Sequence, residues 1–528
     1  MGPLLSLRKQ NYPNFVFLAV LPSLFLHLYF LFINREYPKW DPSEYLLTAF
    51  QAYETRGFIS KIETIYTVRG WRPLLTPAWD WIMLELSGGR VILAEKLGVG
   101  ILYFCFCIYL VFLLRKFLSG LSLLVAILFI TTLPWLFMAF LQLFSEPPFL
   151  VCLLASATHF AYSRGLRSLP HSLAGGLFLG LASCFRPLET LLLLASFLFF
   201  FVSQRRAYTW LNWSGNLKFS SLVAFTIPVI WFAPFSAELM EWVISCTFGK
   251  VALTFAKEDN ATFRSHLFYL LPQVPGIFVL ALAVLACAGK HAVNRGNSLA
   301  LLLCAFAPVL VGAATLNRDL RYFYAPGLFL AIFAIVIFLR ARPQAALVIC
   351  ILFMTVHFTW IATAIHPPLR FIHPIANLLS FRLNTQPLAV IDLDACSAIF
   401  EKIAARAKTD VRQEFLINSV QKNIGFHCLV GFNLMAKERR LNWRFHSLGE
   451  ELQKANIHSL KSKFDFAIIG PVIHTYAGLE LPTDLLKAIR TWEQDSQQPS
   501  EAQSIEVLSF RDSSNFLSYL NDFYFLKF

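Results

Sequence analysis

Charged residues are scarce in this chain. They make up 15% of its 528 residues, whereas hydrophobic residues make up 57%, and the mean hydropathy is +0.58. A soluble domain normally carries about a quarter charged residues, so the composition excludes an ordinary soluble protein. The chain contains instead a series of Leu-, Phe- and Ala-rich runs between residues 16 and 363. Each is about eighteen residues or longer, which is enough to cross a bilayer.

These runs predict a polytopic protein built from helices, since helices and closed barrels are the structures that satisfy their backbone groups in lipid. We expect about eleven membrane-spanning helices. Their predicted positions are 15–33, 91–114, 120–141, 148–163, 171–185, 188–203, 219–235, 267–288, 298–316, 322–339 and 344–364.

Basic residues follow the predicted helices in alternate loops. The positive-inside rule assigns such loops to the cytoplasm. The first run has no small-residue cleavage site after it, so we interpret it as an uncleaved helix with a cytoplasmic N-terminus. We therefore expect an integral, multi-pass protein of a bacterial inner (plasma) membrane, with its C-terminal part outside. The basic residues are Arg8, Lys9, Arg115, Lys116, Arg164, Arg167, Arg205, Arg206, Lys290, Arg295, Arg340 and Arg342.

Patterns typical of metal sites are few. The Asp-x-Asp of "IDLDA" (391–395) follows a strand-like run, which favours a turn at a strand end, and His366 and His373 have no third ligand nearby. We predict no required cofactor; a divalent metal is possible, but no ligand cluster supports one. Nucleic acid is not an expected partner, because the net charge of +13 resides mainly in the membrane part and reflects its topology.

The first loop on the outer side, residues 34–90, is too long for a simple connection. It contains two amphipathic helix-like pieces, 42–56 and 72–86, whose apolar faces are suited to lie flat on the bilayer. This loop is therefore positioned to take part in a reaction on the outer side of the membrane.

The chain changes character after about residue 366, where short apolar runs alternate with polar helix-like segments. Such runs predict a small α/β domain. We therefore divide the chain into an all-α membrane domain, 1–365, and an extracytoplasmic α/β domain, 366–528. From its position, the second domain is a candidate for selecting the acceptor of a reaction. Its predicted strands are 388–393, 464–470, 505–510 and 523–528.

The predicted spans contain almost no ionisable groups. Transporters usually keep such groups within their spans, near mid-membrane. Here acids and arginines gather at the outer ends of helices, which favours chemistry at the membrane surface. A transporter or flippase for a lipid-linked or polar substrate is the alternative, and a non-catalytic scaffold is a third possibility.

Five short motifs occur in order along the outer side: "WDPSEYLLTA", "RGWRPLLTPAWDWIM", "LFSEPPFL", "GLFLGLASCFRP" and "NRDLRYFYAPGLFL". Through these motifs, taken together, the chain resembles the GT-C superfamily of membrane glycosyltransferases, in the branch of protein O-mannosyltransferases and aminoarabinose transferases. The resemblance covers roughly residues 15–340. It implies an enzyme that moves a sugar from a polyprenyl-phosphate donor to a hydroxyl of a lipid, glycan or protein acceptor outside the membrane.

The resemblance also implies roles for particular residues. An attacking hydroxyl needs a base. Asp41 matches the family's acid after the first helix and is the candidate base. Glu44, three residues later, is the alternative candidate. A lipid phosphate leaving group needs cations, and Arg321, with Arg318 and Tyr322, matches the family's basic-aromatic pair.

Further substrate contacts are possible at Arg69, Arg72, Glu146 and Arg186. Structural roles compete with these assignments. Asp41-Pro42-Ser43-Glu44 is a good helix start with a capping box, Arg318 and Arg321 suit an interfacial anchor, and Glu146 and Arg186 suit a cap or a mutual salt bridge.

Overall fold

The computed structural model describes residues 18–33, 41–68, 75–141, 145–163, 165–186, 190, 210–247, 324–341, 343–365, 369, 400–401, 403–405, 412–417, 425–447, 466–469, 506–508 and 523–527. The chain divides into two compact units. One comprises Met1–Ile33, Ile65–Trp79 and Lys96–Ile391, and the other Asn34–Thr64, Asp80–Glu95 and Asp392–Phe528. The second unit therefore combines most of the first outer loop with the tail.

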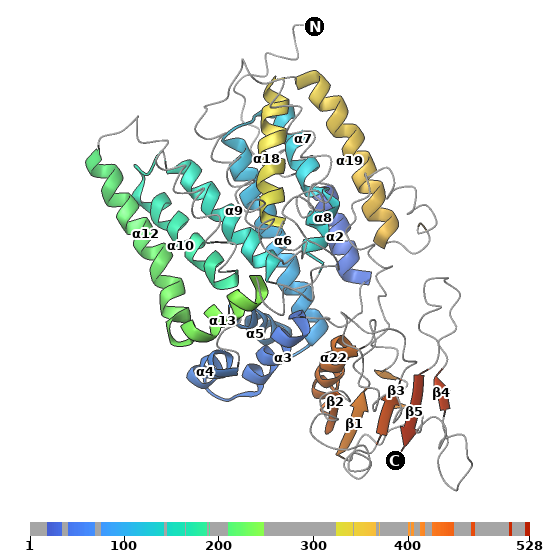
Figure 1. Cartoon of the computed structure of the whole chain (residues 1–528). Helices are drawn as coiled ribbons and strands as arrows, with labels where there is room; N and C mark the ends of the chain where they lie inside the picture. The colour runs from blue at the N-terminus through green and yellow to red at the C-terminus, as the bar shows by residue number, and fades with distance from the viewer. Residues whose placement is uncertain are drawn as a thin grey trace, which may run out of the picture. The chain divides into compact units, whose positions relative to one another are not determined.

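The first unit is helical (Figure 1). Its described elements overlap the predicted spans wherever those spans are described, although one helix begins at Trp210, well before the span predicted at 219–235. Residues 15–17, 188–189, 191–203, 267–288, 298–316 and 322–323 of the predicted spans lie outside the described residues. The elements are α2 (Leu21–Ile33), α6 (Val91–Arg115), α7 (Gly120–Thr131), α8 (Pro134–Ala139), α9 (Glu146–Tyr162), α10 (Leu169–Phe185), α12 (Trp210–Phe232), η3 (Ala233–Phe235), α13 (Ser236–Thr247), α18 (Tyr324–Ala341) and α19 (Pro343–Ile365).

Two described segments, Val91–Arg115 and Gly215–Ser245, are long and apolar enough by length and composition to cross a membrane. Shorter apolar helices accompany them, so the predicted number of spans stays a prediction. The span predicted over 120–141 is divided into α7 and α8. Pro134 explains the break, because proline disfavours a helical residue before it and is itself suited to the first turn of a new helix.

Glycines allow close packing around α10. A Cβ at Gly176 would lie 2.3 Å from the main-chain oxygen of Ser220 in α12, and one at Gly175 would lie 2.7 Å from the Phe160 ring in α9. Ser156 of α9 also donates a hydrogen bond to the Gly175 oxygen, at 2.9 Å. Small residues serve this purpose between membrane helices, and Figure 1 shows α9, α10 and α12 side by side.

The described part of the first outer loop, residues 34–90, contains three helices: α3 (Asp41–Glu54), α4 (Phe58–Val68) and α5 (Leu75–Ser87). The helices predicted at 42–56 and 72–86 are thus confirmed as α3 and α5, whereas α4 was not predicted. Its β-branched residues have weak helix propensity. Gly57 lies just after the end of α3 and has a φ of +90°, a conformation that favours glycine.

The described residues of the tail form a five-stranded mixed sheet of order β2-β1-β3-β5-β4. Strands β1, β2 and β3 are parallel, and β5 is antiparallel to β3 and β4. The strands predicted at 464–470, 505–510 and 523–528 are confirmed, and 388–393 lies outside the described residues. The strands are β1 (Gln413–Ile417), β2 (Trp443–Ser447), β3 (Phe466–Ile469), β4 (Glu506–Leu508) and β5 (Phe523–Lys527).

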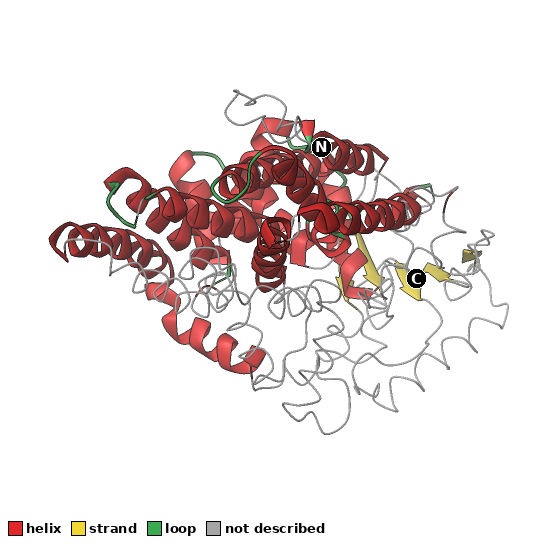
Figure 2. Ribbon diagram, turned by 90° about the horizontal axis from the view of Figure 1, so that it is seen from above, coloured by secondary structure: helices red, strands yellow, loops and turns green. Residues whose placement is uncertain are grey.

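Strands β1 and β2 were missed in the sequence because charged or polar residues interrupt their short apolar patterns. Helix α22 (Gly425–Glu438) connects them, as a parallel pair requires. The buried rings of Phe415 and Phe445 stack at 4.7 Å between centroids, and Phe432 of α22 lies 5.3 Å from Phe445. Figure 2 shows the strands gathered in one region of an otherwise helical structure.

Candidate active site

The candidate base lies at the start of α3. The helix begins at Asp41, so the helix start predicted from "DPSE" is confirmed. Glu44 is buried, with 4% of its surface exposed, and its main-chain oxygen accepts a hydrogen bond from Thr48 Oγ1 at 3.1 Å. Both candidate carboxylates, Asp41 and Glu44, therefore belong to the first turn of α3, the end of the helix dipole that attracts negative charge.

The opposite end of α3 is fixed by its neighbours in the loop. A Cβ at Gly89 would lie 2.8 Å from the Tyr53 ring, so the turn after α5 packs closely on α3. Lys61 of α4 has its Nζ 5.8 Å from the centroid of the Tyr53 ring and pairs with Glu85 of α5. The hydrogen bond from Lys61 holds the pKa of Glu85 below its ordinary value. Trp81 Nε1 donates to the same carboxylate at 2.8 Å.

A second pair of acids lies where α5 leads into α6. Asp80 and Glu95 are 0% and 4% exposed. Both carboxyl oxygens of Asp80 lack a hydrogen-bond partner within the described structure. Burial, together with the charge of Glu95, raises the pKa of Asp80 well above its ordinary value. Asp80 is therefore a neutral acid over a wider range of pH than a surface aspartate.

Glu146 and Arg186 form an ion pair in the helical unit. Arg186 Nη2 donates to Glu146 Oε1 at 2.8 Å, with the two side chains 10% and 2% exposed. Arg186 Nε also reaches Ser145 Oγ at 3.3 Å. Glu146 begins α9 and Arg186 follows α10. The alternative of a mutual salt bridge is thus confirmed, and substrate contact by either residue stays a prediction.

The other predicted site residues lie outside the described residues: Arg69, Arg72, Arg318, Arg321 and Tyr322, as well as the side chain of Asp41. Their roles remain predictions. No group of three or more His, Cys, Asp or Glu suited to a metal occurs within the described ranges, and His366 and His373 lie outside them.

The fold as a whole matches solved membrane enzymes. The aminoarabinose transferase ArnT of Cupriavidus metallidurans bound to undecaprenyl phosphate aligns over 98% of this chain and 98% of its own, with a TM-score of 0.63 and 14% identity. This chain has a GT-C fold. Apo ArnT aligns over 97% of this chain and 98% of its own at a TM-score of 0.60 and 14% identity.

A longer protein shares the GT-C fold. The arabinofuranosyltransferase AftD from mycobacteria aligns over 98% of this chain but 40% of its own length, with a TM-score of 0.52 and 12% identity. No protein-family model and no curated protein matches the chain. The chain thus shares its fold with these solved enzymes at 12–14% sequence identity.

Within this GT-C fold, several charged residues were missed by the sequence interpretation. Asp80 stands alone as an acid in the apolar "PAWDWIML", and a lone ionisable group in such a run is a signal in itself. The pairing of Lys61 with Glu85 carries no comparable signal, because it joins residues of different helices.

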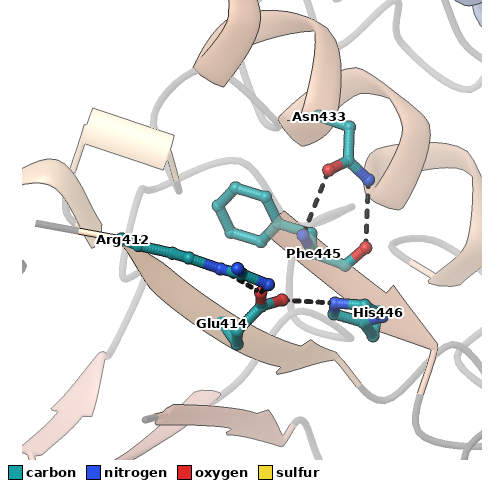
Figure 3. Close-up of polar contacts among 5 residues, drawn as sticks. All are labelled: Arg412, Glu414, Asn433, Phe445 and His446. Atoms are coloured by element: carbon teal, nitrogen blue, oxygen red, sulfur yellow. Dashed lines mark hydrogen bonds and ion pairs between the residues drawn. The ribbon is translucent and has the colours of Figure 1, made fainter. Parts of the chain in front are cut away.

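The tail contains a further polar cluster, shown in Figure 3. Arg412 Nη2 lies 2.7 Å from Glu414 Oε1, and His446 Nε2 lies 2.6 Å from Glu414 Oε2. Burial alone would raise the pKa of Glu414, but the contacts with Arg412 and His446 lower it overall. The cluster joins β1 to β2.

Proposed function

We propose that this protein is a glycosyltransferase that takes a sugar from a polyprenyl-phosphate donor and passes it to an acceptor hydroxyl on the outer face of the bacterial inner membrane. The observation that carries the proposal is the fold match with ArnT over 98% of both chains, in a structure that holds undecaprenyl phosphate. The acceptor is a lipid, glycan or protein.

The reaction is an inverting displacement. A hydroxyl oxygen of the acceptor attacks the anomeric carbon, the bond to the lipid phosphate breaks, and a carboxylate takes the hydroxyl proton. In this proposal Asp41 is the base, and Glu44 is the alternative on the same turn of α3. Arg321, Arg318 and Tyr322 bind the donor phosphate and offset its growing charge.

Arg69, Arg72, Glu146 and Arg186 complete the proposed set of substrate contacts. For Glu146 and Arg186 the ion pair supports a positioning role, because its two side chains hold each other in one geometry. A mechanism of this kind needs no metal for leaving-group departure, since the lipid phosphate is already a good leaving group.

The proposal is tested with purified full-length protein and radiolabelled undecaprenyl-phosphate sugars. We expect label to leave the lipid and appear in an acceptor or in water. Failure to release label from any donor would contradict the proposal and favour the transporter.

The identity of the base is tested with Asp41→Asn and Glu44→Gln. Only one of the two carboxylates is the general base, and the variant that removes it should have a kcat lowered by about 10²–10⁴-fold. Glu63→Gln, an equal charge change at an exposed position of α4, is the control and should keep wild-type turnover. If both site variants turn over normally, neither carboxylate is the base.

A further inference from the structure

Helix α22 of the tail contacts α3 directly, within the second unit. Lys437 Nζ lies 3.3 Å from Glu54 Oε2 and 5.8 Å from the centroid of the Phe50 ring. Phe50 and Glu54 are one helical turn apart, so they lie on the same face of α3. The lysine thus spans an aromatic ring and a carboxylate of one helix, and combines an ion pair with a cation–π contact.

Helix α22 is itself held firmly on the sheet. Asn433 Nδ2 donates to the main-chain oxygen of Phe445 at 3.0 Å, and the Phe445 main-chain N–H donates to Asn433 Oδ1 at 3.1 Å. The Phe432 ring packs on Phe400 and Phe445. Lys437 follows Asn433 by one turn, so it projects from a part of α22 that the sheet fixes.

The contact is made at the far end of α3 from the candidate base. Asp41 and Glu54 are separated by about 20 Å at the helical rise per residue. An α-helix of this length moves as a rigid rod, so fixing Phe50 and Glu54 constrains the start of the helix as well. Tyr53, packed against Gly89, constrains the same end from the side of the loop.

We propose that α22 positions α3, and that Lys437 is a positioning residue for the carboxylates at the start of α3. This inference depends on the proposed function, because it assumes that α3 carries the base. The tail then acts on the transfer step through α3, in addition to any part it takes in choosing the acceptor.

The test uses full-length protein and charge reversal. Lys437→Glu places two carboxylates together and should lower kcat for sugar transfer by about three- to tenfold, with a smaller change in the KM for the donor. It should also speed hydrogen–deuterium exchange in the peptide 41–54. The double variant Lys437→Glu/Glu54→Lys should restore both values, since the opposite charges meet again.

Arg439→Glu is the matched control. Arg439 directly follows α22 and pairs with Glu401 inside the tail, so the same charge change there should leave kcat and exchange of 41–54 unchanged. Normal kcat in Lys437→Glu overturns the inference, whether or not exchange rises, and so does failure of the double variant to recover or an equal loss in the control.

The two proposals fail in different ways. Wild-type protein that transfers no sugar from any donor contradicts the proposed glycosyltransferase function. Exchange of the peptide 41–54 does not depend on turnover, so an unchanged rate in Lys437→Glu overturns the positioning role of α22 in an active or an inactive protein.

Discussion

At the scale of single residues, Asp80 shows how burial changes the behaviour of an acid. Its carboxyl is fully buried near Glu95, and its pKa is raised by burial and by that neighbour. Two buried carboxylates cannot both ionise without a large cost. The folded protein therefore binds a proton that the unfolded chain releases near the ordinary pKa of 3.8.

The sign of the pH dependence follows from this difference. Because the folded state holds the extra proton, the contribution of Asp80 to stability falls as pH rises above about 4 toward the folded pKa. We expect Asp80→Asn, which stays neutral, to flatten the fall in melting temperature as pH rises above about 4. Thermal unfolding in detergent over this range measures it.

Glu85→Gln is the control with the opposite sign. The folded pKa of Glu85 is lowered by Lys61, so its contribution is present above the ordinary pKa of 4.5 and is lost as pH falls through the folded value. Since Glu85 is partly exposed, we expect a small loss at neutral pH. An unchanged slope in Asp80→Asn would show that Asp80 is ionised in the fold.

The ion pair of Glu146 and Arg186 yields a second prediction for single residues. Glu146→Gln would leave the Arg186 guanidinium largely buried without its counter-charge, which costs about 3–5 kcal/mol. We expect a large drop in melting temperature and in the yield of folded protein. Arg439→Gln, which breaks the exposed pair with Glu401, should cost less than about 1 kcal/mol. Similar losses in both variants would mean that burial does not govern the Glu146 pair.

At the scale of elements, the packing of α10 on α12 depends on glycine. Helix α10 contacts both α9 and α12, and at Gly176 a methyl group would meet the main-chain oxygen of Ser220 at 2.3 Å. A main-chain atom cannot rotate away as a side chain can. The two helices would have to separate to admit even one carbon atom.

Gly176→Ala should therefore destabilise the helical unit by about 1–3 kcal/mol through overpacking. Gly215→Ala in α12 is the matched control, because a Cβ there has nothing within 4 Å, and alanine favours a helix over glycine by about 0.5–1 kcal/mol. Melting temperatures of the two variants should move in opposite directions. A neutral Gly176→Ala would show that α10 and α12 can separate at little cost.

At the scale of the whole molecule, the sequence predicted what periodicity and composition determine. The apolar helices, the start of α3 at Asp41 and its end before Gly57 follow from local chemistry. Strands β1 and β2 do not follow from local chemistry. The segments "QEFLI" and "WRFHS" become strands because they pair in parallel with each other, and α22 connects them. Similarly, the pairing of Lys437 with Glu54 joins residues 383 positions apart, which no local pattern can indicate.

The grouping of the loop with the tail changes what a truncation would reveal. Residues 34–64 and 80–95 share a compact unit with 392–528. We expect a protein ending at residue 365 to lose sugar transfer to water as well as to any acceptor, because α3 loses its contact with α22. Parallel assays of donor hydrolysis and acceptor glycosylation measure this. Full retention of donor hydrolysis would instead indicate a tail that serves acceptor choice alone.

The contact between α3 and α22 also has a consequence in time. A ribosome adds about 5–20 residues per second. Lys437 lies 383 residues after Glu54 of α3, so it is synthesised roughly 20–80 s after that helix. During that interval the helix that carries the candidate base is already made while its partner is still unsynthesised. On the proposed function, a nascent chain would gain sugar-transfer activity only after α22 has been synthesised and has folded onto α3.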